Sequence, residues 1–234
     1  MYLMLGTRPD LAYSIGLLAR FSSNPSPLHF ERVCRLLGFL KRTRGTSLIF
    51  DPGDENTLEP KGFTDADYAG DQFNWKSTSG YVFYVCGTVF SWRSKLQDTV
   101  AASTMEAEYI ALYHASLNAV WIRNFLEQVG MALGAPLIIY CDNIPAIEVA
   151  KGEAPHKKAK HFQIKTHLVR HHLQQRLTDI QYISSKDNKA DVLTKLLPKK
   201  DFAAKVIELG LRDSSTSSDS NDSSDSHYDD ATES

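Results

Sequence analysis

Four acidic residues lie where the sequence predicts strand ends or the inner face of a helix. Asp65 ends a short strand-like segment in FTDADYAGD, and Asp142 directly follows the apolar run LIIYC. Glu108 lies on the apolar side of a predicted helix in STMEAEYIAL, and Asp191 lies on a short predicted helix in KDNKADVL. Ligands of α/β sheets gather at the carboxyl ends of strands, so we expect these four carboxylates to converge there.

A cluster of four carboxylates needs cations to neutralise it, because like charges at short range oppose one another's ionisation. Carboxylate oxygens are hard ligands that select Mg²⁺ or Mn²⁺. Two such ions about 4 Å apart promote in-line displacement at a phosphodiester, one activating water and the other stabilising the leaving oxygen. The residue types therefore predict a nuclease with two divalent ions as cofactors.

The elements that would position these residues alternate in the way expected of an α/β sheet. β-branched and aromatic residues predict three antiparallel strands at residues 61–64, 81–85 and 89–93. An apolar stripe predicts a long helix over 103–129, closed by Gly130. The remaining elements are expected as a buried strand at 137–141, a helix at 143–151, a basic helix at 161–176, a strand at 178–183 and a short helix at 188–196.

The domain organisation follows from changes in composition. Residues 1–50 are predicted to form a small helical segment, with two amphipathic helices separated by the turn-rich residues 22–27. We expect a linker at 51–60, the α/β domain at 61–199 and a terminal helix at 200–212. Residues 213–234 are rich in Ser and Asp and are predicted to be disordered, because they have too little apolar surface to offset the entropy of ordering.

Composition sets limits on the class of protein. Of the 234 residues, 42% are hydrophobic and 23% are charged, which is typical of a soluble globular protein. The three cysteines form no Cys-x-x-Cys pair and indicate reduced thiols in an intracellular protein of the cytoplasm or nucleus. No apolar run approaches the roughly 18 residues of a membrane span, so no membrane partner is expected. The residues before the acidic tail have a small excess of basic over acidic side chains, which is compatible with a polyanionic partner.

Several strings together resemble one known family. The sequence is similar, in the same order, to the ribonuclease H domain of copia-type retrotransposon Pol polyproteins, and residues 6–46 resemble the end of the reverse transcriptase that precedes it. The strings that carry the resemblance are FTDADYAGD, KSTSGYVF, SWRSKLQ, STMEAEYIAL, CDNIPAI, HKKAKHFQIKTHLVR and DNKADVLTKLLP.

The resemblance implies a fold and a role for each carboxylate. The fold would be a ribonuclease H-like mixed five-stranded sheet, three antiparallel strands followed by two parallel ones, flanked by helices. Asp65 would bridge two metal ions, Asp191 would help hold the water-activating ion, and Glu108 and Asp142 would hold the ion at the leaving group. The implied reaction is cleavage of the RNA strand of an RNA/DNA hybrid, with the rest of a reverse transcriptase as a further partner.

The sequence departs from the family pattern in two places. Many cellular ribonucleases H have a histidine shortly before the last carboxylate, and the segment YISSKDNKAD before Asp191 has none, which puts rapid product release in doubt. No Tyr-x-Asp-Asp string is present, so no polymerase activity is expected.

Other acidic and histidine residues are weighed and left out of the site. Asp67 and Asp71 are typical turn residues, and Glu106 points away from Glu108 on a helix. His167 and His171 have the spacing of a metal pair but no third ligand, so zinc is disfavoured.

Basic and hydroxyl side chains are candidates for nucleic-acid contacts, with a solvated helix or a simple hairpin as the open alternatives. We expect the tryptophans Trp92 and Trp121 to pack in the core. The predicted nucleic-acid-binding residues are Lys76, Ser77, Thr78, Lys157, Lys158, Lys160, Lys165 and Arg170.

Two rival functions have less support in the sequence than the nuclease. An integrase would need a glutamate roughly 35 residues after Asp142, and the segment QQRLTDI offers none. The alternative from a different class is a domesticated or inactive copia fragment acting as a binding protein, for example a secreted RxLR-type effector acting in host cells. The segment Arg35–Gly38 only loosely approaches that motif, and secretion would need a signal peptide that this sequence lacks.

Overall fold

The computed structural model describes residues 1–51, 59–153 and 163–213. Most of the predicted linker, the lysines Lys157, Lys158 and Lys160 and nearly all of the predicted acidic tail lie outside the described residues.

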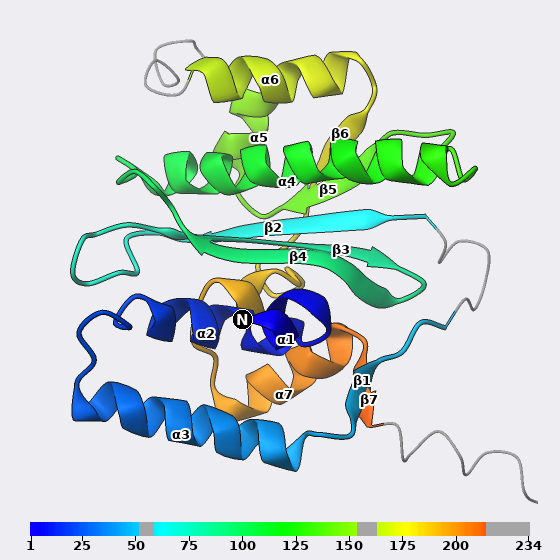
Figure 1. Ribbon diagram of the computed structural model, residues 1–234. Helices are drawn as coiled ribbons and strands as arrows, with labels where there is room; N and C mark the ends of the chain where they lie inside the picture. Colours follow the sequence, from blue (N-terminus) through cyan, green and yellow to red (C-terminus); the bar gives the residue numbers. More distant parts are fainter. Residues whose placement is uncertain (52–58, 154–162, 214–234) are drawn as a thin grey trace, which may run out of the picture.

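A mixed five-stranded sheet forms the centre of the fold (Figure 1). The strand order is β4-β3-β2-β5-β6, in which β3 is antiparallel to β2 and β4, and β5 is parallel to β2 and β6. This topology confirms the predicted α/β sheet of three antiparallel strands followed by two parallel ones. The strands are β2 (Lys61–Asp67), β3 (Thr78–Val85), β4 (Thr88–Leu96), β5 (Leu137–Cys141) and β6 (Thr178–Tyr182).

Three helices lie on one face of the sheet, as Figure 1 shows: α4 (Thr104–Gln128), α5 (Ile144–Lys151) and α6 (Gln163–Gln174). Helix α4 begins where predicted, because the Ser103 side chain accepts a hydrogen bond from the Glu106 backbone N–H at 3.2 Å. The main core lies between these helices and the sheet and includes Tyr109, Leu112 and Ile139.

The other face carries the N-terminal helices and the last helix (Figure 1). A second core joins them to the sheet through Ala12, Val82 and Leu209. The Trp92 indole N–H also donates to the Met4 carbonyl at 2.7 Å, so Trp92 packs as expected. The elements are α1 (Tyr2–Gly6), the 3₁₀ helix η1 (Pro9–Leu11), α2 (Ala12–Ala19), α3 (Pro27–Arg42) and α7 (Lys199–Glu208).

A buried ion pair and a small sheet hold the N-terminal segment in place. The Arg8 guanidinium donates to both oxygens of Asp10, at 2.9 and 2.7 Å, and to the carbonyl and hydroxyl of Thr43. Strand β1 (Thr46–Leu48) pairs antiparallel with β7 (Leu211–Asp213). The division of the chain at residues 51–60 stays a prediction, and both parts contribute to the second core.

Two predicted helices near the C-terminus are wrong in extent. The helix expected at 188–196 is only the 3₁₀ turn η5 (Asp191–Leu193), because the Asn188 side chain accepts from the Ala190 N–H at 3.1 Å and so replaces helical bonds. The helix expected at 200–212 ends at Glu208, since Gly210 has a φ of +82° and turns the chain into β7.

The expected burial of Trp121 is also wrong. Its side chain is 58% exposed and stacks on Phe125, with ring centroids 5.6 Å apart. On a helix of 25 residues, this position lies on the solvent side of the apolar stripe, where the neighbouring aromatic ring covers part of the indole.

Candidate active site

The four predicted carboxylates are brought together at one edge of the sheet. Strands β2 and β5 are parallel neighbours, so Asp65 near the end of β2 and Asp142 just after β5 lie at the same edge. Glu108 reaches this edge from α4, and Asp191 begins η5. Burial raises the pKa of Asp65 to about 6, and the charges of Asp191 and Asp142 add to the rise. Asp65 is therefore within electrostatic reach of Asp191 and Asp142, and Glu108 is within reach of Asp65 and Asp142.

Glu108 is the most strongly perturbed member of the cluster. It is 5% exposed, and burial raises its pKa to about 9, with further contributions from Asp65 and Asp142. A backbone hydrogen bond from Ala66 opposes the rise. Neutral pH therefore leaves this carboxyl protonated in the metal-free protein, and a cation at the site would favour its ionised form.

The donor atoms fit a hard divalent ion. Within the described residues, Glu108 Oε2 and Asp142 Oδ1 are buried and have no hydrogen-bond partner. Ligand atoms of Glu108, Cys141 and Asp142 all lie within 4.8 Å of one another. Burial raises the pKa of the Cys141 thiol well above its usual value, so this sulfur stays protonated. The two carboxylates are therefore the ligands available to Mg²⁺ or Mn²⁺.

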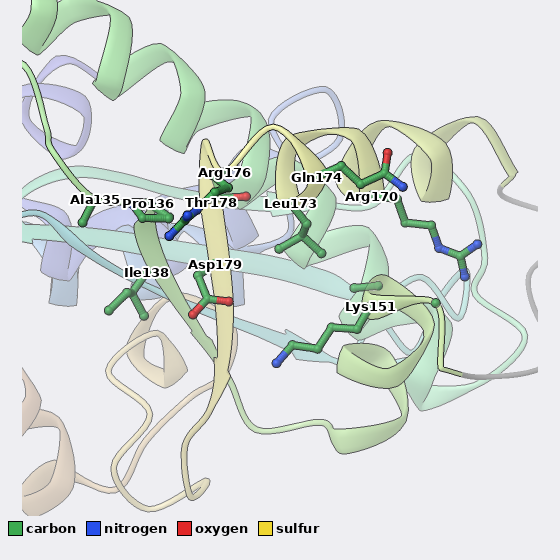
Figure 2. A pocket seen from close by; sticks show the side chains of 12 residues that line it. Ala135, Pro136, Ile138, Lys151, Arg170, Leu173, Gln174, Arg176, Thr178 and Asp179 are labelled. Atoms are coloured by element: carbon green, nitrogen blue, oxygen red, sulfur yellow. The ribbon is translucent and has the colours of Figure 1, made fainter.

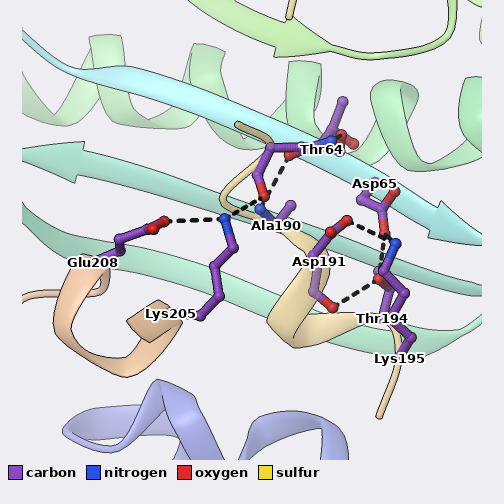
Figure 3. A network of polar contacts seen from close by, with 9 residues as sticks. Thr64, Asp65, Ala190, Asp191, Thr194, Lys195, Lys205 and Glu208 are labelled. Atoms are coloured by element: carbon purple, nitrogen blue, oxygen red, sulfur yellow. Dashed lines mark hydrogen bonds and ion pairs between the residues drawn. The ribbon is translucent and has the colours of Figure 1, made fainter. Parts of the chain in front are cut away.

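Lys195 and Thr194 hold the Asp65–Asp191 side of the cluster (Figure 3). The Lys195 ammonium lies 2.9 Å from Asp191 Oδ1 and 3.9 Å from Asp65 Oδ2. The Thr194 hydroxyl donates a hydrogen bond to Asp65. Both contacts favour the ionised form of Asp65 and partly offset the effect of its burial on the pKa.

The segment that carries Asp191 is fastened to the sheet. The Asn188 amide donates to the Thr64 carbonyl at 2.9 Å, and Lys205 on α7 donates to the Asn188 carbonyl at 3.2 Å. Gly80 on β3, opposite Asp65 in register, allows the close approach, since an added Cβ would lie 2.7 Å from Thr194 Cγ2. The backbone of β3 thus leaves room for η5.

Sequence reasoning missed the supporting roles of Asn188, Thr194 and Lys195. All three lie in the string DNKADVLTK, at positions −3, +3 and +4 from Asp191. The spacing of +3 and +4 places side chains on the same side of a helical turn, and this signal was present in the sequence.

The predicted nucleic-acid contacts have mixed positions. Ser77 and Thr78 are buried. The Ser77 hydroxyl accepts from the Ala69 N–H and the Thr78 hydroxyl accepts from Arg20, so both hydroxyls form hydrogen bonds within the protein. Lys76 donates to the Asp98 carbonyl at 2.8 Å from a partly exposed position. Lys165 is partly exposed and lies 5.8 Å from the Tyr113 ring centroid.

A group of cations surrounds His114, and of these only Lys165 was predicted from the sequence as a nucleic-acid contact. Burial lowers the pKa of His114 to about 4, and Arg93, Lys165 and Lys95 lower it further. Arg93 and Lys95 lie on β4, His114 on α4 and Lys165 on α6. We name these four residues the β4–α4 basic patch. The alternation of charged residues in SWRSKL is the sequence signal for it.

Arg170 lies away from the carboxylates. It lines a cavity of about 720 Å³ at the starts of β5 and β6, the opposite ends of these strands from Asp142 (Figure 2). Its guanidinium donates twice to the Val149 carbonyl, at 3.1 and 2.8 Å, and so fixes the end of α5. The cavity contains none of the four predicted carboxylates.

The residues left out of the site have structural contacts. Asp71 forms an ion pair with Arg20 at 2.9 Å, and its other oxygen accepts from the Phe73 N–H. Glu106 accepts from the Ala102 N–H at 2.8 Å near the start of α4. Among the histidines of α6, His172 is buried and contacts the Ser116 hydroxyl at 2.7 Å.

Two long retrotransposon polyproteins are similar in sequence to this chain. The Pol polyprotein of transposon TNT 1-94 of Nicotiana tabacum is 40% identical over 202 residues, 86% of this chain and 15% of the relative. The Pol polyprotein of transposon RE1 of Arabidopsis thaliana is 34% identical over 203 residues, 86% of this chain and 14% of the relative. The chain belongs to the copia-type retrotransposon Pol family. It spans about one-seventh of the length of these polyproteins.

A further relative of this copia-type chain is much shorter. Secreted RxLR effector protein 161 of Plasmopara viticola is 47% identical over 122 residues, which are 52% of this chain and 84% of that protein. No protein-family model matches the chain.

Solved structures similar to this copia-type chain include two ribonucleases H1. LC11-RNase H1, in complex with an RNA/DNA hybrid, has a TM-score of 0.44 and 17% identity over 58% of this chain and 94% of that chain. RNase H1 from Halobacterium salinarum NRC-1 has a TM-score of 0.40 and 16% identity over the same shares.

Among the helices of the described residues, none combines the length and the apolar composition that a membrane span requires.

Proposed function

We propose that this chain is a ribonuclease H-type endonuclease that cleaves the RNA strand of RNA/DNA hybrids with two Mg²⁺ or Mn²⁺ ions. The observation that carries the proposal is the convergence of four carboxylates, two of which present buried oxygens with no partner among the described residues. Membership of the copia-type Pol family supports the same reaction. The site residues proposed as catalytic and metal-binding are Asp65, Glu108, Asp142 and Asp191.

The proposed roles follow from where each side chain comes from. Asp65 is central, since its pKa responds to both Asp191 and Asp142, and it would contact both ions. Glu108 and Asp142 would hold the ion on their side, and Asp191 would hold the other. The bound ions would supply an activated water and neutralise charge on the leaving oxygen. Lys195 and Thr194 would keep the Asp65 carboxylate ionised and oriented.

The β4–α4 basic patch supports a polyanionic substrate. It gathers three permanent cations around His114 near the middle of α4, and Asp98, which pairs with Lys95 at 3.2 Å, offsets part of their charge. Lysine and arginine contacts of this kind supply most of the affinity for a nucleic-acid backbone. Lys76 from the predicted set donates to the Asp98 carbonyl and extends the same surface, and we propose the hybrid duplex as the partner of this surface.

The deciding experiment is cleavage of an end-labelled RNA/DNA hybrid by the purified chain in Mg²⁺ or Mn²⁺. We compare Asp65→Asn and Asp142→Asn with Asp201→Asn, a matched control on the exposed first turn of α7. The expected result is cutting of the RNA strand that is lost in both site variants and kept in the control. Duplex DNA and duplex RNA should stay intact.

Two results would overturn the proposal. A folded chain that cuts no hybrid in either metal would leave the carboxylate cluster without this activity. Cutting that persists in Asp65→Asn and Asp142→Asn would place the chemistry elsewhere or in a contaminant.

The rest of a reverse transcriptase is proposed as a protein partner. Helices α2 and α3 line an apolar groove, and no residue of α3 is fully buried. Phe30 and Leu37 are 69% and 58% exposed there. Surfaces of this kind mark protein contacts. The chain spans only part of its polyprotein relatives, and their remaining length includes the candidates for this contact.

The alternative is a binding protein derived from the same element. The match to Secreted RxLR effector protein 161 covers most of that relative, and it is the observation that favours this reading. Absence of cleavage together with secretion of a tagged full-length protein would favour the alternative. Cleavage together with retention in the cytoplasm or nucleus would favour the nuclease.

A further inference from the structure

A cavity of about 430 Å³ lies on the same face of the sheet as α7, close to the candidate active site but separate from it. Its walls come from β2, β5, the loop after β6 and the end of α7. Phe63 in its floor precedes Asp65 by two residues on β2, so the two side chains share a face about 7 Å apart along the strand. None of the four carboxylates lines the cavity.

The floor of the cavity is aromatic. Phe63 and Tyr140 stack with ring centroids 5.1 Å apart and an interplanar angle of 26°. Tyr84 meets Phe63 edge to face from the other side, at 5.6 Å. Phe63 and Tyr84 are buried, whereas Tyr140 is partly exposed. The Tyr140 ring is therefore held in place by the Phe63 ring beneath it, and another flat ring can stack on it.

The rim of the cavity is formed by three lysines. Lys61 and Lys186 are exposed, and the Lys189 ammonium lies 4.6 Å from the Tyr84 ring centroid and 5.5 Å from that of Phe63. No ion pair joins any of these three lysines to a carboxylate in the described parts of the chain.

The acidic side chains of the cavity are already engaged. Glu208 pairs with Lys205 at 3.1 Å, and Asp187 accepts from the Ser184 hydroxyl at 2.6 Å. The aromatic rings beside the Lys189 ammonium compensate its charge only in part, so a bound anion would compensate it further.

The geometry points to this cavity as a binding site for a single-stranded nucleic-acid segment, with a base stacked on Tyr140 and phosphates contacting Lys61, Lys186 and Lys189. Stacking platforms combined with cations bind single strands with little sequence preference, because every base has an aromatic face. The site is distinct from the proposed cleavage site, and binding to it needs no divalent metal.

The test is fluorescence anisotropy with a labelled twelve-nucleotide single strand, in EDTA and at several salt concentrations. The full chain is compared with Lys61→Gln/Lys186→Gln and with Tyr140→Leu. Lys199→Gln/Lys200→Gln on exposed turns of α7 is the control for loss of charge, and Tyr140→Phe is the control for loss of the ring. Urea unfolding midpoints establish that each variant is folded.

We expect Tyr140→Leu to weaken binding by at least about fivefold, the lower end for loss of one base–aromatic stack, and Tyr140→Phe to bind normally. The pocket lysine pair should reduce the slope of log affinity against log salt by about 1.4, and the α7 pair should not. Equal losses in both lysine pairs would overturn the inference, because net charge alone would explain them. Binding of adenosine monophosphate without binding of the strand would also overturn it.

This experiment is independent of the proposed cleavage. A chain that binds the single strand in EDTA but cuts no hybrid would support the cavity and contradict the nuclease. A chain that cuts hybrid but binds single strands equally well with and without the Tyr140 ring would support the nuclease and contradict the cavity as a binding site.

Discussion

Replacing Glu108 by Gln should stabilise the metal-free protein at neutral pH while removing its function as a metal ligand. The Glu108 carboxyl is 5% exposed, and its pKa is raised from an ordinary 4.5 to about 9. Because this carboxyl ionises at a higher pH in the folded state than in the unfolded state, the unfolding free energy is highest below about pH 4.5. It falls as the pH rises towards 9. A neutral glutamine of the same shape has no such dependence on pH.

The magnitude follows from the shift in pKa. Between pH 4.5 and pH 7 the parent loses about 3 kcal/mol of unfolding free energy through this carboxyl, at roughly 1.36 kcal/mol per pH unit. Glu108→Gln should therefore exceed the parent by about 3 kcal/mol at pH 7 and match it near pH 4.5. Among the described residues Oε2 has no hydrogen-bond partner, so the substitution breaks no hydrogen bond at that atom.

The assay is urea unfolding in EDTA from pH 4.5 to pH 9, followed by tryptophan fluorescence. Glu127→Gln, on an exposed turn of the same helix, is the matched control and should follow the parent curve. Saturating Mg²⁺ should reverse the order of stability, because only the parent gains the full binding energy of the ion. Parallel curves for parent and Glu108→Gln would refute the assignment of the pKa to this group.

Three further predictions concern the metal, the glycine behind η5 and the N-terminal ion pair. Loading the site with Mg²⁺ at pH 7 should release about one proton per chain, measured by calorimetry in two buffers of different ionisation enthalpy. Gly80→Ala should reduce cleavage at least about tenfold in a folded protein, since its Cβ would lie 2.7 Å from Thr194 Cγ2 and displace the turn that carries Asp191. Arg8→Met should lower the unfolding free energy by about 3 kcal/mol in urea, because it leaves the buried Asp10 unpaired.

The parts of the fold with strong local patterns were predictable. Helix α4 was placed within one residue at each end, because an apolar stripe runs between a Ser N-cap and a glycine stop. The strand before Asp142 followed from a short apolar run that stops at an acidic residue, whereas β2 continues past its predicted end at Thr64 to Asp67. These local signals sufficed to predict that the carboxylates converge, without any knowledge of the distances between them.

Features that depend on distant pairing were not predictable. Strands β1 and β7 are three residues each, and Leu48 pairs with Leu211 across most of the described chain. Such short segments have no periodicity to detect, and their pairing depends on the packing of α3 against α7, where the ring centroids of Phe39 and Phe202 lie 6.0 Å apart. The shortness of η5 had the same origin, because Asn188 bonds to Thr64 in β2 rather than continuing a helix.

The supporting residues explain how the carboxylate cluster tolerates its own charge. Lys195 places an ammonium 2.9 Å from Asp191 and 3.9 Å from Asp65, Thr194 donates a hydrogen bond to Asp65, and Glu108 is protonated at neutral pH. A divalent ion bound by the same oxygens would compete with this ammonium and this proton. Metal binding must therefore displace the Glu108 proton and compete with the Lys195 ammonium. The affinity for metal should rise with pH, because the proton leaves more easily, and it should rise when the Lys195 charge is removed.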